Sequence, residues 1–362
     1  MAAAVIGETR SSPDGRRMSV EEIEHELARL RMNEDGTLAL RASVLNLIVV
    51  TDEDSAQSVT RAVSDIAGRY PSRAIVLISD PEEAEKNLEL QLSAFCSVRG
   101  ESSTHVCAEQ ITIHAEGPPA EHLESLAGPL LIPDLRVFLW YPGPFSLSSP
   151  EFAGMMTLAD RIILDSAAAD DCELSLKEIA ELLDDPETPA VGDLQWVQLT
   201  PWRSLVAQIF DPPERAGELE RLRGIEILHA PDGECRALLF VGWLASSLGW
   251  NLEGSTRTEN GREARFSGPS GEITTEMSTA SPDARFRQVR LYSDDYGFEV
   301  ARSRDLSEAR TVVTRGSEVL GERTVHLGHF DLGVLLGEEL SFRGRDGIYE
   351  NALRAAVEIL EP

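Results

Sequence analysis

The spacing of hydrophobic residues changes along the chain, and the change predicts two differently built halves. In the first half, nearly continuous apolar runs, typical of strands covered on both faces, alternate with stretches of helical spacing. The runs are Val44–Val50, Ala74–Ile78, Leu135–Tyr141 and Arg161–Leu164. Strands joined through a helix in this way form βαβ units, so the first half is expected to be a Rossmann-like α/β layer with a mixed sheet.

One segment of this half has a different period. Leu88–Val98 alternates apolar and mostly polar residues, which indicates an amphipathic strand, and after a polar turn Val106–Ile113 can pair back on it. We therefore expect a hairpin inserted in the α/β layer. Cys96 and Cys107 fall on its two strands, where a redox-responsive disulfide is one interpretation and two reduced cysteines are the other.

The second half carries short strands separated by turn signals such as the Asn-Gly pair at 260–261. These strands are expected around Ala264–Ser267, Ile273–Ser278, Gln288–Ser293, Phe298–Ser303 and Thr311–Thr314. Two helices, near Leu332–Leu340 and Gly347–Leu360, close the chain. This pattern predicts an α+β domain built on an antiparallel sheet.

The two halves meet near Asp193–Pro213, a segment that contains two of the five tryptophans. Thr200 is expected to cap a helix there and Pro201 to occupy its first helical position. Two tryptophans at a junction indicate either a packed core or a surface that grips a partner. The predicted parts are a disordered leader at 1–17, a Rossmann-like domain at 18–215 and the α+β domain at 216–362.

Composition limits the classes of partner. The 362 residues include 33 basic and 62 acidic side chains, a net charge of −29. Such a chain repels phosphate backbones, so nucleic-acid binding is not expected. No run approaches the ~20 apolar residues of a membrane span, and no signal peptide is recognisable. We therefore expect a cytoplasmic protein whose cysteines are reduced, with Cys235 filling space in the core.

A search for catalytic motifs gives no assembled site. The strand Val44–Val50 is followed by TDEDSAQS, which is acidic and lacks the glycines of a dinucleotide-binding turn, so no nucleotide cofactor is expected. His326 and His329 lack a third strong ligand at a recognised spacing, so no metal is expected either. Cys107 with His105 could form a thiol site, although a structural strand is the simpler interpretation.

Several strings, taken together and in order, resemble the glucose-6-phosphate dehydrogenase assembly protein family, OpcA. They are PSRAIVL (71–77), VCAEQITI (106–113), PLLIPDLRVFLWYPG (129–143), ADRIILDS (159–166), DLQWVQLTPWRSLVAQIFD (193–211), GWLASSLGW (242–250) and ELSFRGRDGIYENAL (339–353). The resemblance implies a non-catalytic protein without a cofactor that binds glucose-6-phosphate dehydrogenase and promotes its active oligomer.

The resemblance also suggests residues for contact with the dehydrogenase, because they match family strings and carry charged or aromatic side chains. They are Arg73, Trp140, Asp160, Arg161, Trp196, Trp202 and Arg203. One alternative is an enzyme or sensor that binds a sugar phosphate through Arg73, Arg161 and Arg203. Another is a purely structural scaffold.

Overall fold

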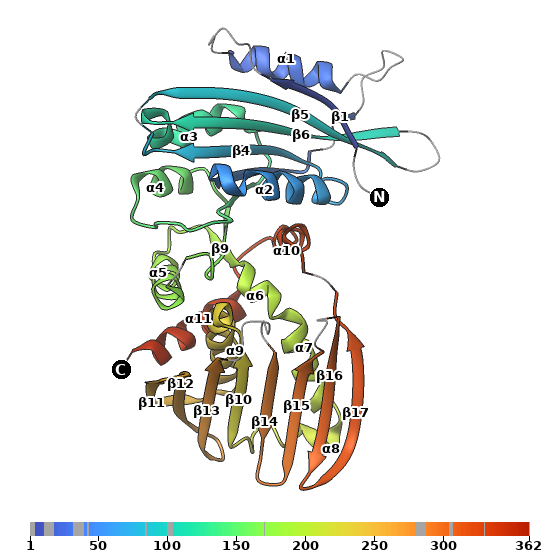
Figure 1. Ribbon diagram of the computed structural model, residues 1–362, viewed down its shortest axis with the longest axis vertical. Helices are drawn as coiled ribbons and strands as arrows, with labels where there is room; N and C mark the ends of the chain where they lie inside the picture. Colours follow the sequence, from blue (N-terminus) through green and yellow to red (C-terminus); the bar gives the residue numbers. More distant parts are fainter. Residues whose placement is uncertain are drawn as a thin grey trace. The chain divides into compact units, whose positions relative to one another are not determined.

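The computed structural model describes residues 4–10, 18–31, 40–41, 43–83, 85–99, 104–169, 171–279, 287–303, 307–328 and 330–361. The chain forms two compact units (Figure 1). Unit 1 comprises residues 1–168, 187–194 and 330–345, and unit 2 comprises 169–186, 195–329 and 346–362. This division differs from a single boundary after residue 215, because residues 169–186 and 195–215 belong to unit 2 and residues 330–345 return to unit 1.

Unit 1 is built on a nine-stranded sheet. Its strands are β1 (Ala4–Arg10), β2 (Leu40–Arg41), β3 (Leu45–Thr51), β4 (Ser72–Asp80), β5 (Asn87–Arg99), β6 (Thr104–Glu116), β7 (Val137–Trp140), β8 (Arg161–Leu164) and β9 (Ala190–Asp193). The parallel strands lie in the order β6-β4-β3-β7-β8-β9. In chain order this is the strand arrangement of a Rossmann fold, with its reversal point between β3 and β7. The Rossmann-like prediction for this part of the chain is confirmed.

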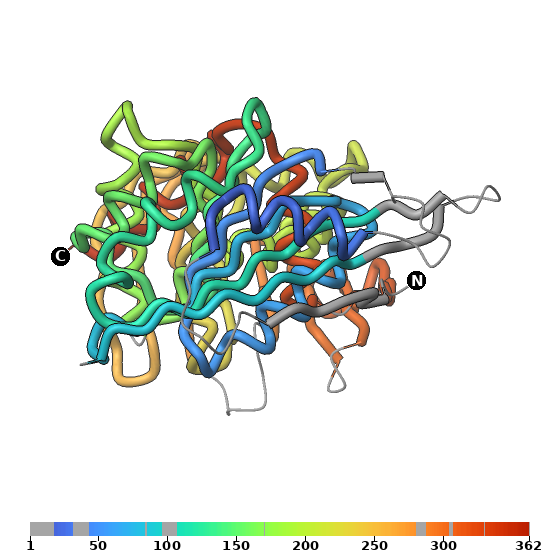
Figure 2. Tube along the Cα trace, turned by 90° about the horizontal axis from the view of Figure 1, so that it is seen from above, coloured from blue at the N-terminus to red at the C-terminus, as the bar shows by residue number. Residues whose placement is uncertain are grey.

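Helices cover this sheet. Those of unit 1 are α1 (Val20–Leu30), α2 (Glu53–Ile66), α3 (Leu123–Ala127), α4 (Pro150–Met156) and α10 (Leu332–Glu339). Every residue of β3 is buried, as the continuous apolar run predicts. Helix α10 packs against α2, and α1 lies along β5 (Figure 2). The first of the two closing helices therefore belongs to the Rossmann-like unit rather than to the second domain.

The expected hairpin is present. β5 and β6 pair antiparallel from Asn87 opposite Glu116 to Arg99 opposite Thr104. β6 also pairs in parallel with β4, so the hairpin extends the main sheet instead of standing apart from it. Residues 4–10, expected as part of a disordered leader, form the edge strand β1 on β5. Residues 1–3 and 11–17 lie outside the described residues.

Unit 2 is built on an eight-stranded sheet in the order β11-β12-β13-β10-β14-β15-β16-β17. Its strands are β10 (Gly224–His229), β11 (Asn251–Thr258), β12 (Gly261–Gly268), β13 (Gly271–Thr279), β14 (Gln288–Tyr292), β15 (Tyr296–Arg302), β16 (Glu308–Arg315) and β17 (Glu318–His326). Every pairing is antiparallel except that of β10 with β13. The antiparallel prediction is thus confirmed apart from one pair.

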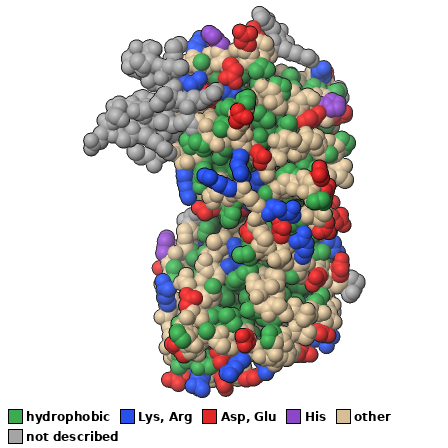
Figure 3. Space-filling view, turned by 180° about the vertical axis from the view of Figure 1, so that it is seen from behind, with side chains coloured by type: hydrophobic (Ala, Val, Ile, Leu, Met, Phe, Trp, Pro, Cys, Tyr) green, Lys and Arg blue, Asp and Glu red, His purple; other side chains and the backbone are tan. Residues whose placement is uncertain are grey.

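Helices α7, α9 and α11 contact this sheet. The helices of this part of the chain are α5 (Cys172–Asp184), α6 (Leu194–Gln198), α7 (Thr200–Phe210), α8 (Pro213–Ala216), α9 (Glu234–Leu248) and α11 (Gly347–Leu360). Figure 1 shows the strands in front of α7 and α8. Figure 3, from the other side, shows apolar surface in the middle of this unit and charged side chains toward its rim.

Among the described residues, no helix is both long enough and apolar enough to cross a bilayer.

Candidate functional site

In a doubly wound sheet, ligands bind beyond the carboxyl ends of the strands where the strand order reverses. In unit 1 this position lies between β3 and β7. Directly after β3, Asp52 caps α2, and its Oδ1 accepts a hydrogen bond of 2.7 Å from the backbone N–H of Ser55. Glu53 and Asp54 occupy the first turn of the same helix. A helix N-terminus that would attract a phosphate is therefore occupied by the chain's own carboxylates.

Two acidic groups with raised pKa values follow β7: the buried Tyr141 and the half-buried Glu151 on α4. The ring of Tyr141 packs 5.2 Å from that of Phe152, measured between centroids. Burial, with a smaller contribution from Glu151, raises the pKa of Tyr141 well above its ordinary value. Burial and the charge of Glu124 also raise the pKa of Glu151. Both environments favour the neutral form of the acid.

Arg73 is fully buried and already paired. From β4, its Nε donates to Glu109 Oε2 on β6 at 2.8 Å, and its Nη1 donates to Glu24 Oε1 on α1 at 2.7 Å. Burial opposes the charged form, but the two glutamates outweigh it and the pKa of Arg73 is raised. Arg73 therefore ties β4, β6 and α1 together, and it presents no surface to a partner or a sugar phosphate.

Arg161 on β8 has the same kind of role. Its Nη2 donates to Glu339 Oε2 on α10 at 2.7 Å, and its Nη1 donates to the Gly344 carbonyl at 2.7 Å. Both side chains of the ion pair are buried. The suggestion that Arg73 and Arg161 contact a partner or hold an anion is thus not supported by their placement, because each is occupied inside unit 1.

The tryptophans are also interior. Trp140, Trp196 and Trp202 are all buried, which favours the packed-core interpretation of these side chains over the surface one. Asp160 is exposed, and its Oδ2 accepts from the backbone N–H of Val137 at 2.8 Å at the start of β7. Of the suggested contact residues, Asp160 and Arg203 keep exposed surface.

Arg203 lies in a cluster at the start of α7. Its guanidinium carbon is 3.4 Å from the centroid of the Trp196 ring, and its Nη2 donates to Thr200 Oγ1 at 3.0 Å. The expected cap by Thr200 is wrong: α7 begins at Thr200 without a side-chain cap, and the hydroxyl accepts from Arg203 instead. Among the described residues, no carboxylate forms an ion pair with Arg203. Burial lowers the pKa of Arg203 to about 10, and Asp346 offsets this in part.

Asp346 explains how the indole is held. Its Oδ2 accepts from Trp196 Nε1 at 2.9 Å, while its Oδ1 accepts from the backbone N–H groups of Ile348 and Tyr349 and so caps α11. The sequence reasoning missed this residue, although an aspartate directly before an apolar helix is an N-cap signal. It also missed Glu109 and Glu339, which nothing in the local pattern singles out.

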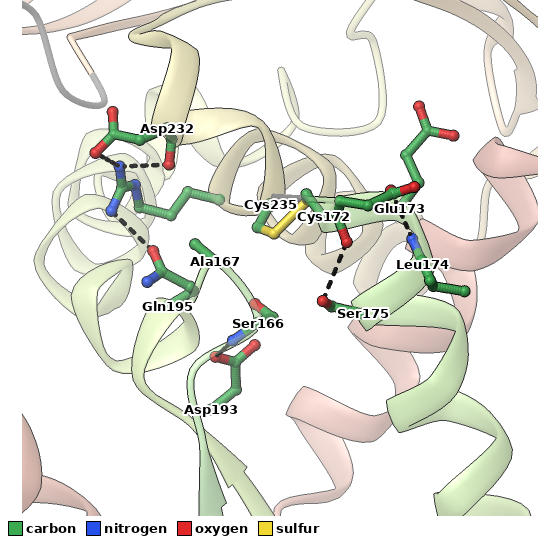
Figure 4. The surroundings of a disulfide bond; sticks show 12 residues. Ser166, Ala167, Cys172, Glu173, Leu174, Ser175, Asp193, Gln195, Asp232 and Cys235 are labelled. Atoms are coloured by element: carbon green, nitrogen blue, oxygen red, sulfur yellow. Dashed lines mark hydrogen bonds and ion pairs between the residues drawn. A yellow bond between two sulfur atoms is a disulfide. The ribbon is translucent and has the colours of Figure 1, made fainter. Parts of the chain in front are cut away.

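The cysteines correct another expectation. Cys172 at the start of α5 and Cys235 at the start of α9 form a disulfide with a Cα–Cα distance of 5.6 Å, so Cys235 is not a reduced filler of the core (Figure 4). Next to Cys235, Arg236 Nη1 donates to Gln195 Oε1 at 2.8 Å. The bond joins two helices that are distant in sequence.

The other proposed cysteine pair is only partly described. Cys107 is disulfide-bonded, which removes it as a nucleophile paired with His105. Its Cα partner in the sheet is Cys96, whose side chain lies outside the described residues. His326 is the last residue of β17, whereas His329 lies outside the described residues. Within the described part of the chain, no group of three or more side chains could hold a metal ion.

Two family models match the chain. The first, described as the N-terminal domain of a glucose-6-phosphate dehydrogenase subunit, covers residues 63–181. The second, the C-terminal domain of the same subunit, covers residues 189–353. Together the models span most of the chain.

Curated relatives have the same family name. The putative OxPP cycle protein OpcA of Synechocystis sp. is 27% identical over 313 residues, which is 82% of this chain and 65% of that protein. The protein of the same name from Nostoc punctiforme is 31% identical over 191 residues, 52% of this chain and 40% of that protein. The chain thus spans less than two thirds of the length of these relatives.

Solved structures resemble the fold. KijD10, a 3-ketoreductase from Actinomadura kijaniata bound to NADP and TDP-benzene, has a TM-score of 0.52 at 12% identity, covering 87% of this chain and 95% of that one. An NAD-binding oxidoreductase from Klebsiella pneumoniae has a TM-score of 0.51 at 12% identity, covering 88% and 98%. Identity this low relates the folds alone. Because the family models match most of the sequence, as the ordered strings predict, the chain belongs to the OpcA family of glucose-6-phosphate dehydrogenase assembly proteins.

Proposed function

We propose that this chain is a non-catalytic assembly factor that binds glucose-6-phosphate dehydrogenase and favours its active oligomer. The names of the matched models and of the curated relatives support the choice of partner. The observation that carries the non-catalytic part of the proposal is the carboxylate cap at the reversal point of the Rossmann-like sheet. There Asp52 occupies the N-terminus of α2.

This cap matters because the similar folds are oxidoreductases. In a dinucleotide-binding fold the pyrophosphate sits at this helix N-terminus, beside glycines that let the backbone approach. Here Glu53 and Asp54 follow Asp52, so a pyrophosphate would meet three carboxylates instead of free N–H groups. The chain has a fold similar to that of these oxidoreductases. The carboxylates at the N-terminus of α2, however, disfavour phosphate binding there.

The sugar-phosphate alternative loses its principal ligands. It requires Arg73 and Arg161 as anion ligands, but both are buried and paired with Glu109 and Glu339. A phosphate would have to displace a carboxylate from each arginine and expose a buried charge. This arrangement favours the assembly role over the metabolite-binding one.

An activator of this kind must bind the active oligomer more tightly than the inactive form, since equal affinity shifts nothing. Moving an enzyme from 1% to 99% active requires about a 10⁴-fold difference in affinity. A smaller difference gives partial activation that depends on the concentration of the chain.

The test uses the purified chain and the dehydrogenase from the same cell. We expect no reduction of NAD or NADP by the chain alone, and an increase in dehydrogenase activity and particle mass when the two are mixed. Nicotinamide absorbance and light scattering after size exclusion measure the two effects. Asp52→Asn, which keeps the helix cap and removes its charge, should activate as the unaltered chain does.

Two results would contradict the proposal. Sustained turnover by a preparation free of the dehydrogenase would make the chain an enzyme. Unchanged dehydrogenase activity and mass at saturating concentrations of the chain would remove the assembly role.

A further inference from the structure

The eight-stranded sheet of unit 2 has one face whose side chains are largely exposed, and among the described residues of that unit no helix covers it (Figure 1). On β12, Ala264 and Phe266 are buried on the helix side, while Glu263 and Arg265 alternate with them and are exposed. The same alternation continues on β13 and β10, where Glu276 and Glu226 are exposed. An antiparallel sheet with one solvated face is ordinary, so the content of that face decides its meaning.

Charged side chains are aligned in one row across this open face. Glu263 lies opposite Glu276, Glu276 opposite Glu226, and Glu226 opposite Arg290. Beyond Arg290 the row continues through Glu299, Val312 and Glu322 to the edge strand β17. Arg290 forms ion pairs with the carboxylates on both neighbouring strands, at 3.5 Å from Glu226 and 2.9 Å from Glu299. Within the described residues, Glu263 and Glu276 have no ion pair.

Three glutamates directly opposite one another lower the stability of a sheet, because like charges on neighbouring strands repel. A shallow hollow of about 130 Å³ lies within this row, lined by Glu226, Glu276, Leu228, Gln288 and Arg290 among others. Its two carboxylates outnumber the one guanidinium of Arg290, and with the leucine they suit a long basic side chain, whose stem is apolar and whose tip is charged. The repulsion would become attraction once cations are laid across the row.

The whole face has the same charge bias. Its acidic members are Glu226, Glu263, Glu272, Glu276, Glu299, Glu308 and Glu322, and its basic members are Arg265, Arg290 and Arg310. At the β17 edge, Val319 and Leu320 are 58% and 48% exposed and add apolar surface. β17 itself is exposed along almost its whole length, so the edge of the sheet is also open.

The size of the face fits a stable complex. Eight strands about 4.8 Å apart span roughly 34 Å, and strands of about seven residues add roughly 23 Å in the other direction. The resulting footprint of roughly 800 Å² is what one partner contributes to a standard interface. A second copy of this chain does not match this face, because two acidic faces repel each other.

We propose that this open face is the surface on which glucose-6-phosphate dehydrogenase docks, through a patch of that enzyme rich in arginine and lysine, with one basic side chain entering the hollow between Glu226 and Glu276. The inference rests on the proposed function and adds the location and chemistry of the contact. Arg203, on α7, lies on the helix side of the same sheet. It is therefore not part of this face.

The test is Glu276→Arg, compared with Glu181→Arg on α5. The two variants make the same charge change at exposed positions of unit 2. Binding of the full chain to the dehydrogenase is measured between 50 and 500 mM NaCl, together with thermal unfolding. We expect Glu276→Arg to weaken binding at least about tenfold and to flatten its salt dependence. The same variant should raise the melting temperature of the chain by about 2–4 °C, because an arginine between Glu226 and Glu263 removes the repulsion. Glu181→Arg should change affinity less than about threefold.

The other outcomes separate the two proposals. If Glu276→Arg binds as the unaltered chain does, the docking face is wrong and the assembly role stands. If both variants lose affinity equally, net charge rather than this face governs binding, and the inference is also wrong. If the unaltered chain forms a dimer that Glu276→Arg dissociates, the occupant is a second copy. If the unaltered chain does not bind the dehydrogenase at any salt concentration, both proposals fail.

Discussion

Ion pairs and disulfides occur in both units, since Cys107 of unit 1 is disulfide-bonded and Arg262 of unit 2 pairs with Glu173 at 2.7 Å, but different ties are prominent in each. In unit 1 buried ion pairs tie distant parts of the chain together: Arg73 joins β4 to β6 and α1, and Arg161 joins β8 to α10. In unit 2 a covalent bond between Cys172 and Cys235 joins α5 to α9. Arg203 of unit 2 also matches a family string. It stacks on the indole of Trp196 and has no ion pair among the described residues.

This difference shows that a motif can single out residues without revealing their role. Arg73, Arg161 and Arg203 all match strings of the same family, yet the first two act inside the fold. A buried ion pair is costly to break because the remaining partner is left charged in the interior, whereas an arginine without a carboxylate partner leaves nothing unpaired. Removing each arginine therefore tests the comparison directly.

The largest effect is expected from Arg73→Met. Among the described residues, this change leaves the buried Glu109 with Arg31, at 2.9 Å, as its one ion-pair partner. We expect unit 1 to lose about 3–5 kcal/mol of unfolding free energy, measured by urea denaturation. The control is Arg29→Met, which breaks the exposed pair with Glu26 on α1 and should cost less than about 1 kcal/mol. Equal losses from the two variants would mean that the buried network has no special weight.

The second effect concerns the covalent tie of unit 2. Cys172 and Cys235 are 63 residues apart, so the disulfide restricts a long loop of the unfolded chain. Replacing both by alanine should lower the unfolding free energy by about 2–4 kcal/mol. Reductant should lower the melting temperature of the unaltered chain by more than that of the double variant, which keeps the disulfide of Cys107. An unaltered chain with the same melting temperature in both conditions would show that the bond does not stabilise unit 2.

How far the sequence predicts this architecture depends on whether the signal is local. The buried run Leu45–Thr51 and the amphipathic hairpin of β5 and β6 follow from periodicity alone, and both are present. Other features depend on partners distant in sequence. β1 is an edge strand only because β5 offers a free side, and no local pattern pairs Cys172 with Cys235.

The candidate sites divide in the same way. The sequence TDEDSAQS predicts the acidic start of the helix after β3, and the structure adds the hydrogen bond from Ser55 to Asp52. The burial of Arg73 and Arg161 could not be predicted from the sequence, because their partners Glu109 and Glu339 lie on other strands or helices. The row of glutamates on the open face of unit 2 requires the strand register, which the sequence does not provide.

A smaller effect on stability, with a clear effect on function, is expected from Arg203→Lys. Lysine keeps the charge but loses the planar group that stacks on Trp196 and can hold a carboxylate at two points. We expect the unfolding free energy to change by less than about 1 kcal/mol and activation of the dehydrogenase to fall. Trp202→Ala, which empties a buried site, should instead cost about 3–5 kcal/mol. If Arg203→Lys unfolds the chain as readily as Trp202→Ala, Arg203 is an internal tie like Arg73.

The smallest expected effect is a pH dependence of stability due to His229 in unit 2. His229 in unit 2 is buried, and burial is the main cause that lowers its pKa below the ordinary 6.5. Below pH 6.5 the unfolded chain binds a proton at this position that the folded chain does not, so stability falls as the pH drops and recovers as it rises. His229→Gln should reduce this dependence between pH 5 and 7, measured by melting temperature. A variant and an unaltered chain with parallel pH profiles would contradict the assignment.

The return of residues 330–345 to unit 1 has a consequence for how the protein is made. Glu339, the buried partner of Arg161, is synthesised 178 residues after it. At about 5–20 residues per second, synthesis of the stretch from Ala168 to Phe330 takes on the order of 10–30 s. During that time the first unit is exposed without α10 on α2 and with Arg161 unpaired by Glu339. The nascent chain thus has a period in which chaperones have access to this unit, and a truncation before residue 330 would make that state permanent.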